Sequence, residues 1–138
     1  MLPPDIFIIA HEPLASALKT CAQHIFSNVE SNVDQITAID IPSDVDTRTF
    51  AKHLQNLVQR KLTERGILIF TDIRGATPAN LAHKVATYPN ICVISGVNLP
   101  ALITAINQTE GPIRRFMLVC EGAIHSSVTS MNGRRSSC

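Results

Sequence analysis

Aromatic residues and charge are both scarce in this 138-residue chain. Tryptophan is absent, and aromatic residues make up only 4% of the sequence, which leaves little material for a surface that stacks on bases. Charged residues make up 17% and the formal net charge is +1, so the chain lacks the dense positive field of a typical nucleic-acid binder. The 45% of hydrophobic residues argues against disorder. We therefore expect a folded protein that does not bind nucleic acid.

Long apolar runs are absent as well. The longest fall well short of the ~18 residues that a membrane span needs. No basic segment precedes the first apolar run, Ile6 to Ala10, so we expect no signal peptide. The four cysteines lie far apart and three of them fall inside apolar segments, which is typical of reduced core residues. These features predict a cytoplasmic protein without direct membrane insertion.

Short apolar runs alternate with helical patterns along the chain, whose length fits one domain. We predict a single domain over residues 1–131 and a flexible tail over 132–138. The runs typical of buried strands are Ile6 to Ala10, Ile36 to Ile41, Gly66 to Thr71 and Ile91 to Ser95. The helical patterns cover Leu14 to Ile25, Phe50 to Leu62, Thr77 to Ala86 and Ala101 to Asn107.

This alternation predicts an α/β fold with an open, mostly parallel sheet and helices on both faces. Periodicity does not decide between helix and strand for the segment from Arg114 to Glu121. If the strands follow the order 2-1-3-4, the first and third strands are neighbours. Their carboxyl ends then form the crevice in which ligands of open α/β sheets bind.

Polar residues follow both of those strands. His11 ends the first strand and Asp72 follows the third. After a glycine turn at Gly75, Thr77 is expected to cap the next helix, with Pro78 in its first helical position. The order 2-1-3-4 therefore brings His11 beside Asp72.

A histidine and a carboxylate in this arrangement point to nucleophilic chemistry. The carboxylate binds one ring nitrogen, fixes the tautomer and leaves the other nitrogen as a nucleophile. Two helix N-termini, the N–H groups of the Gly75–Ala76 turn and the Thr77 hydroxyl are placed to surround an anion. The sequence thus predicts a phosphohistidine site at His11, oriented by Asp72.

Three ordered motifs carry a resemblance to a known family. They are Ile8 to His11, Thr71 to Asn80 and Ser95 to Pro100. Together they resemble mannose-family enzyme IIA of the phosphoenolpyruvate-dependent sugar phosphotransferase system, over roughly Ile6 to Asn107. The resemblance implies a phosphocarrier that takes a phosphoryl group from phospho-HPr and passes it to an EIIB partner, without a cofactor.

The resemblance also implies roles for individual residues. His11 matches the phosphoryl acceptor, Asp72 the carboxylate that orients it, and Thr77 the hydroxyl that contacts the phosphoryl oxygens. We expect Arg74 to contact phosphate or a partner, and Asn98 to line the site. The family fold has four parallel strands in the order 2-1-3-4. It adds a C-terminal antiparallel strand exchanged in a homodimer, which we expect within Ala123–Met131.

The chain departs from the family pattern at two positions. The family usually has glycine after the acceptor histidine and before the hydroxyl residue, where this chain has Glu12 and Ala76. Glu12 adds a negative charge beside a group that must accept a dianionic phosphoryl group. We expect this charge to disfavour the phosphorylated state unless the Glu12 side chain points away or pairs with Arg74.

Three other functions compete with this one. A regulatory phosphoprotein of an incomplete phosphotransferase system would need the same site at His11, so the sequence does not separate it from a transport component. A receiver domain phosphorylated on Asp72 would need an acidic pair after the first strand and a late lysine, yet the last lysine is Lys84. A nucleotide-binding module is disfavoured because neither glycine-rich phosphate-binding motif occurs.

Metal binding is also disfavoured. The cysteine and histidine pairs at Cys21 with His24 and at Cys120 with His125 have no further ligands at short spacing. We therefore expect no metal centre.

Overall fold

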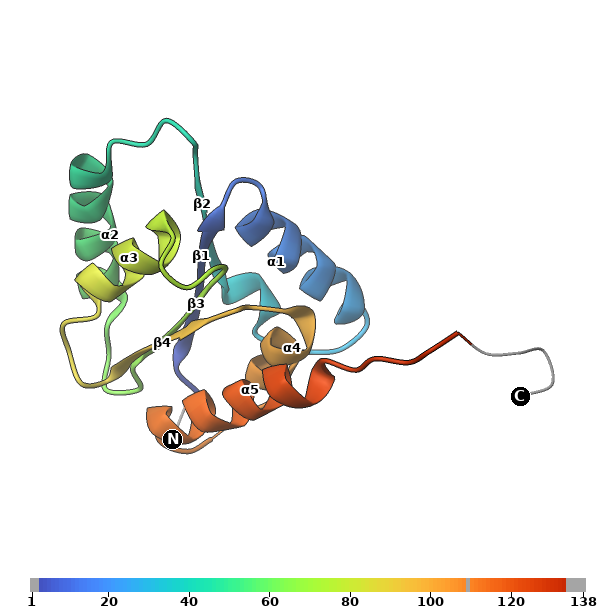
Figure 1. The fold of residues 1–138 in the computed structure, drawn as a ribbon. Helices are drawn as coiled ribbons and strands as arrows, with labels where there is room; N and C mark the ends of the chain where they lie inside the picture. The colour runs from blue at the N-terminus through green and yellow to red at the C-terminus, as the bar shows by residue number, and fades with distance from the viewer. Residues whose placement is uncertain (1–2, 109, 134–138) are drawn as a thin grey trace.

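The computed structural model describes residues 3–108 and 110–133. A four-stranded parallel sheet has the order β2-β1-β3-β4 (Figure 1). The elements are β1 (Asp5–His11), α1 (Leu14–Ile25), the 3₁₀ helix η1 (Val33–Gln35), β2 (Thr37–Ile41), α2 (Thr47–Lys61), β3 (Ile67–Thr71), α3 (Thr77–Val85), β4 (Ile91–Ser95), α4 (Leu99–Asn107) and α5 (Ile113–Ser127). The predicted fold class and strand order are confirmed.

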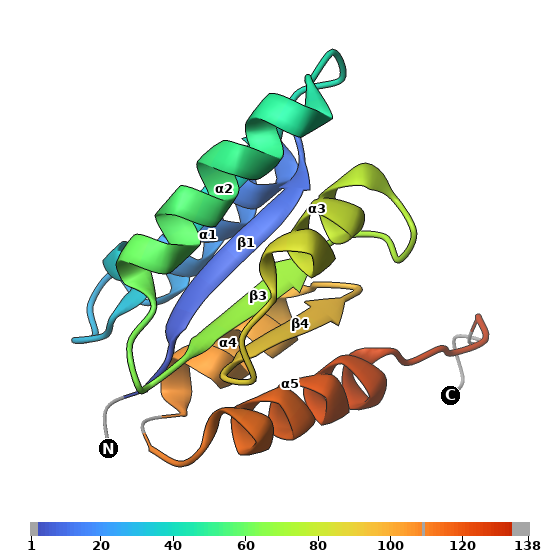
Figure 2. The same ribbon diagram turned by 90° about the vertical axis from the view of Figure 1, so that its left-hand side faces the viewer.

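The two central strands are apolar on both faces because helices cover both. In β1 the residues from Ile6 to Ala10 are buried, and every residue of β3 is buried. Side chains at alternate positions point to opposite faces of the sheet. Ile8 and Phe70 belong to the core under α1, α4 and α5, whereas Ile9 and Ile69 belong to the core under α2 and α3. Figure 2 shows α2 and α3 together on one face.

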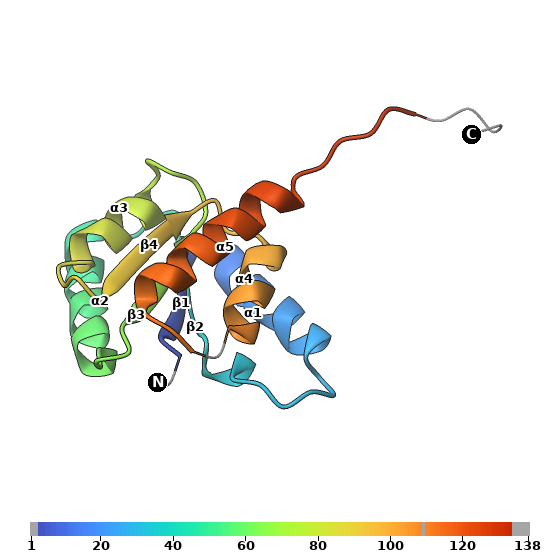
Figure 3. The same cartoon turned by 90° about the horizontal axis from the view of Figure 1, so that it is seen from below.

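The segment whose type the sequence left open is helical. Helix α5 buries Phe116 and Cys120, which are four residues apart and therefore lie on one side of the helix. It packs beside α4 and against β3 and β4, as the view from below shows (Figure 3). This spacing also fits the apolar run of a strand, which is why periodicity did not resolve it.

The strand expected within Ala123–Met131 is not present in the single chain. Its first five residues, Ala123 to Ser127, form the last part of α5. The residues from Val128 to Gly133 follow without helix or strand and lead away from the sheet (Figure 1). Exchange of a strand between two chains stays a prediction. Of the tail predicted over 132–138, residues 134–138 lie outside the described residues.

Two further expectations were wrong in detail. The N-cap of α3 is Ala76, with φ −82° and ψ 170°, and Thr77 is already its first residue. Pro78 therefore occupies the second helical position, where its missing N–H still costs no hydrogen bond. Of the cysteines, Cys92 and Cys120 are buried as expected, but Cys21 is exposed. Cys138 lies outside the described residues.

Within the part of the chain that the structure covers, no helix has the length and apolar character required to cross a membrane.

Candidate functional site

The sheet topology brings His11 and Asp72 to the same edge. Strand β1 ends at His11, and its neighbour β3 ends at Thr71, so Asp72 is the next residue. Ile9 lies opposite Thr71 in the parallel register of the two strands. The two side chains predicted to work together therefore emerge from adjacent strand ends at the carboxyl edge of the sheet.

The Asp72 carboxylate holds both the backbone and the ring of His11. Its Oδ2 accepts a hydrogen bond from the His11 N–H at 2.9 Å and lies 2.5 Å from His11 Nδ1. Its Oδ1 accepts the N–H of Ile73 at 2.7 Å. The Asp72 side chain is 8% exposed, whereas that of His11 is 51% exposed. The pairing favours the tautomer with the proton on Nδ1, which leaves the Nε2 lone pair free to react.

The electrostatic environment keeps Asp72 ionised. Burial is the largest single influence on its pKa and raises it. The hydrogen bonds from the His11 N–H, the His11 ring and the Ile73 N–H lower the pKa, as does the charge of a protonated His11 ring. Together they hold the pKa of Asp72 below its ordinary value of 3.8. Asp72 is therefore a carboxylate at neutral pH.

The end of β3 is anchored to β4. The Gly96 N–H donates to the carbonyl oxygen of Asp72 at 2.7 Å and to that of Thr71 at 3.0 Å. The Thr71 hydroxyl, which is fully buried, donates to Ser95 Oγ at 2.9 Å. Sequence reasoning missed this support, although two hydroxyl residues that end neighbouring apolar strands were a possible signal. The anchoring fixes the backbone from which Asp72 projects.

An open cleft of about 400 Å³ lies beside His11. Its lining residues are His11, Glu12, Ile41, Pro42, Ser43 and Asp44. Glu12 is exposed and forms no ion pair with Arg74 within residues 3–108 and 110–133. The pairing that would neutralise Glu12 is therefore not formed. Two carboxylates, those of Glu12 and Asp44, line this cleft together with His11.

In the turn before α3, one of the amides predicted to surround an anion already has an acceptor in the chain. Gly75 has φ +84°, a conformation that glycine adopts without strain. The Ala76 N–H donates to the carbonyl oxygen of Ile73 at 3.2 Å, so this amide is already engaged. No side chain caps α3. The N–H groups of Thr77 and Ala79 accordingly have no acceptor in the described part of the chain.

Thr77 does not contact His11 through a hydrogen bond in the described residues. It lines a separate cavity of about 140 Å³ together with Thr47, Asn80, Leu81 and Lys84. Asn98, which was predicted to line the site, caps α4 by accepting the Ala101 N–H at 3.0 Å. Its Nδ2 donates to Ser127 Oγ of α5 at 3.0 Å. Both hydrogen-bonding groups of the Asn98 side chain thus have protein partners.

The N-terminus of α1 is occupied by a residue that the sequence analysis did not single out. Asp40 of β2 accepts the Ser16 N–H at 3.1 Å through Oδ1 and the Ser16 hydroxyl at 2.5 Å through Oδ2. A carboxylate therefore already fills the place expected for an anion. Of the two helix N-termini predicted to surround an anion, only that of α3 has no side-chain partner. An aspartate between two apolar strand residues, Ile39 and Ile41, was the sequence feature that could have predicted this contact.

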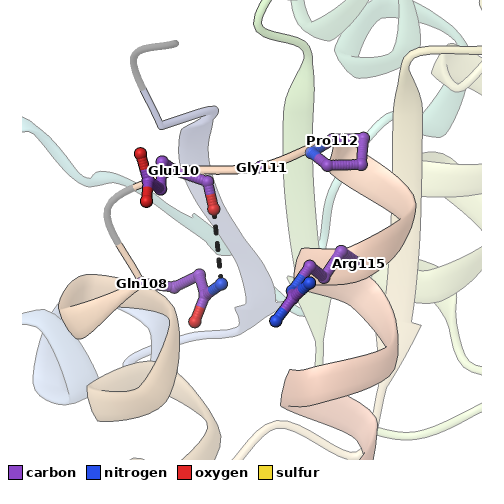
Figure 4. Close-up of a pocket in the computed structure, with 5 residues that line it drawn as sticks. All are labelled: Gln108, Glu110, Gly111, Pro112 and Arg115. Atoms are coloured by element: carbon purple, nitrogen blue, oxygen red, sulfur yellow. Dashed lines mark hydrogen bonds between the residues drawn. The ribbon is translucent and has the colours of Figure 1, made fainter.

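A third hollow lies at the connection between α4 and α5 (Figure 4). It has a volume of about 370 Å³. Figure 4 shows Arg115 directed toward it and the Gln108 amide donating to the Glu110 carbonyl oxygen at 3.3 Å. Its lining holds no nucleophile paired with a base. The candidate nucleophile is therefore His11, beside the other cleft. Within the described ranges, no three His, Cys, Asp or Glu residues gather to hold a metal ion.

Fold and site together define a small α/β protein with an accessible histidine. The histidine ends one parallel strand, and a carboxylate that follows the neighbouring strand holds its ring. Residues 5–112 match the family described as EIIA-man, PTS system fructose IIA component. The chain belongs to this family, and the predicted resemblance is confirmed. Family and fold support a phosphocarrier role in the phosphotransferase system. Among curated proteins, none matches the chain significantly.

Solved structures share the fold at low sequence identity. The mannose/sorbose-specific IIA subunit from Enterococcus faecalis has a TM-score of 0.84 and 18% identity, over 97% of this chain and 98% of that one. The component EIIA from Streptococcus agalactiae has a TM-score of 0.76 and 21% identity, over 91% and 95%. The IIA protein associated with the fucose utilization operon of Streptococcus pneumoniae has a TM-score of 0.76 and 19% identity, over 94% and 93%.

Proposed function

We propose that this protein is a phosphocarrier that accepts a phosphoryl group from phospho-HPr on His11 and passes it to an EIIB partner. The observation that carries the proposal is the contact between His11 Nδ1 and Asp72 Oδ2, at 2.5 Å, on a ring that is half exposed. A buried carboxylate orients the ring, and the exposed part of the ring is accessible to a protein partner. The family match supports the same role.

The transfer follows from this geometry. The Nε2 lone pair of His11 attacks phosphorus in line, a new N–P bond forms, and the bond between phosphorus and the donor breaks. The donor keeps the electron pair of that bond. The Nδ1 proton stays on His11 beside Asp72, whose negative charge stabilises the positive charge that develops on the ring. In the second step the acceptor's nucleophile attacks phosphorus, and the electron pair returns to Nε2.

The phosphoryl oxygens need donors near Nε2. We assign this role to the open N-terminus of α3, through the Thr77 N–H and hydroxyl, and to the turn at Gly75. Arg74 is exposed beside this turn and supplies a positive charge. The Ala76 N–H contributes only if it leaves the Ile73 carbonyl oxygen. Glu12 and Asp44 oppose the phosphorylated state by charge repulsion.

Phosphorylation from phosphoenolpyruvate tests the proposal. With enzyme I and HPr present, the protein should gain one acid-labile, base-stable phosphoryl group, detected by mass spectrometry. The His11→Ala variant should not be labelled. His83→Ala is the matched control, because His83 is an exposed histidine on α3. Equal labelling of the His11→Ala variant and the wild type would exclude His11 as the acceptor.

We also propose that the protein forms a homodimer through the edge of its sheet. Strand β4 lies at the edge of the sheet, where its backbone groups are open to a further strand. A cleft of about 290 Å³ runs between β4 and α5. Leu118, Val128 and Met131 are 63%, 76% and 81% exposed, which is unusual for large apolar side chains. A second copy would cover them.

A further inference from the structure

The segment that follows His11 is held against β2 by two sets of contacts. The backbone N–H of Glu12 donates to the Ile41 carbonyl oxygen at 3.0 Å. Three residues beyond the turn at Glu12 and Pro13, the Ser16 N–H and hydroxyl both reach the Asp40 carboxylate. Asp40 and Ile41 are the last two residues of β2, and Asp40 lies opposite Ala10 in the register. The contacts therefore lie directly beside the end of β1.

Asp40 also replaces a missing helix cap. The N-cap of α1 is Pro13, which offers no side-chain acceptor. The Asp40 carboxylate accepts the third amide of the helix instead, at 3.1 Å. Pro13 is also connected to Ser16, because the Pro13 carbonyl oxygen lies 3.2 Å from Ser16 Oγ. The same oxygen accepts the Ala17 N–H at 3.0 Å. A chain of contacts thus runs from Asp40 through Ser16 to Pro13.

We propose that Asp40, acting through Ser16, is a positioning residue for His11. Asp72 holds the ring from the side of β3, but among the described residues no hydrogen bond from that side reaches Glu12 or Pro13, which lead away from the histidine. On the side of β2, the Ile41 carbonyl oxygen holds Glu12, and Asp40 holds Pro13 through Ser16. Two carboxylates, that of Asp40 near the end of β2 and that of Asp72 directly after β3, thereby determine where Nε2 points. The consequence for phosphoryl transfer rests on the proposed role of His11, whereas the consequence for the ring does not.

The other end of α1 supplies a matched control. Asp34 in η1 accepts a hydrogen bond from Gln23 Nε2 of α1 at 2.9 Å. Asp34, which lies just before β2, and Asp40, which lies in β2, therefore each join α1 to this part of the chain. Only Asp40 does so beside His11. Replacing Asp34 removes one hydrogen bond between a carboxylate and α1, and replacing Asp40 removes two, both to Ser16. Both variants weaken the attachment of α1, but only the Asp40 variant does so beside His11.

Single-turnover transfer to the full-length protein tests the proposal. At saturating phospho-HPr, Asp40→Ala and Ser16→Ala should each transfer about tenfold more slowly, because a misplaced nucleophile is costly. The KM for the donor should stay within about twofold. Asp40→Asn keeps an oxygen for the Ser16 N–H and should recover most of the rate. Asp34→Ala should match the wild type. Equal rates for Asp40→Ala and Asp34→Ala would overturn the proposal.

Nitrogen-15 NMR of labelled histidine separates this proposal from the phosphocarrier function. The His11 ring resonances should shift or broaden in Asp40→Ala and Ser16→Ala, and should not change in Asp34→Ala. This holds even if wild-type His11 accepts no phosphoryl group, an outcome that would defeat the proposed function alone. Unchanged ring resonances in Ser16→Ala and in folded Asp40→Ala would overturn the positioning role. If Asp40→Ala does not fold, Ser16→Ala decides by the same two readouts.

Discussion

At the scale of single residues, the site depends on one carboxylate that serves three donors. Asp72 receives the His11 N–H and ring through Oδ2 and the Ile73 N–H through Oδ1. An asparagine has nearly the same shape but only one acceptor oxygen and no charge. It cannot stabilise the ring as positive charge develops on it. Asp72 is thus the residue at which a conservative change separates chemistry from folding.

Asp72→Asn should slow phosphoryl transfer by about 10- to 100-fold while leaving the fold intact. Stopped-flow transfer and circular dichroism measure the two effects. Because the folded pKa of Asp72 lies below 3.8, its charge stabilises the fold above that pH. The stabilisation is lost as the pH falls through the folded pKa. The difference in unfolding free energy between wild type and variant should therefore shrink under acid conditions. Unchanged transfer would remove Asp72 from the mechanism.

At the scale of elements, the strands were predictable and the helix starts were less so. Runs such as Ile6 to Ala10 are apolar throughout because two layers of helices cover them, and this pattern is local. The Thr77-Pro78 pair fits two adjacent helix starts, at Thr77 or at Pro78, and the extended backbone at Ala76 selects the earlier one. The contact between Ser16 and Asp40 joins two elements across the fold. No local sequence pattern predicts such a tertiary contact.

Helix α4 offers a test of a predicted lining residue. Asn98→Ala removes the cap of α4 and the contact with Ser127, so it should lower the free energy of unfolding by about 1–2 kcal/mol. Urea denaturation measures this loss. Ser127→Ala, which removes only the contact between α4 and α5, should cost less. Transfer by Asn98→Ala should stay within about twofold of the wild type. A tenfold slower transfer with unchanged stability would instead make Asn98 part of the site.

At the scale of the whole molecule, the open sheet separates the proposed phosphorylation site from the proposed dimer surface. The carboxyl edge of β1 and β3 presents His11, while the free edge of β4 and the exposed residues after α5 lie elsewhere. The order of the strands, which the motifs and the family resemblance predicted together, makes His11 and Asp72 neighbours. The direction of the chain after Ser127 was not predictable in the same way, because Val128 and Met131 remain largely exposed in the described part of the chain.

A chain that ends at Ser127 should be monomeric, because it lacks Val128 and Met131, whereas the full-length protein should have the mass of a dimer. Light scattering after size exclusion measures both masses. Leu14→Ser is a suitable control, since Leu14 is also exposed but lies on α1, away from β4. A monomeric full-length protein would contradict the dimer.

The position of the phosphoryl group on the His11 ring shows whether Asp72 orients the histidine for transfer. Phosphorus-31 and nitrogen-15 NMR of the phosphorylated protein distinguish the two ring nitrogens. Because Asp72 holds Nδ1, we predict phosphorylation at Nε2 of His11, and none in the His11→Ala variant. A phosphoryl group on Nδ1, or on any other residue, would contradict it.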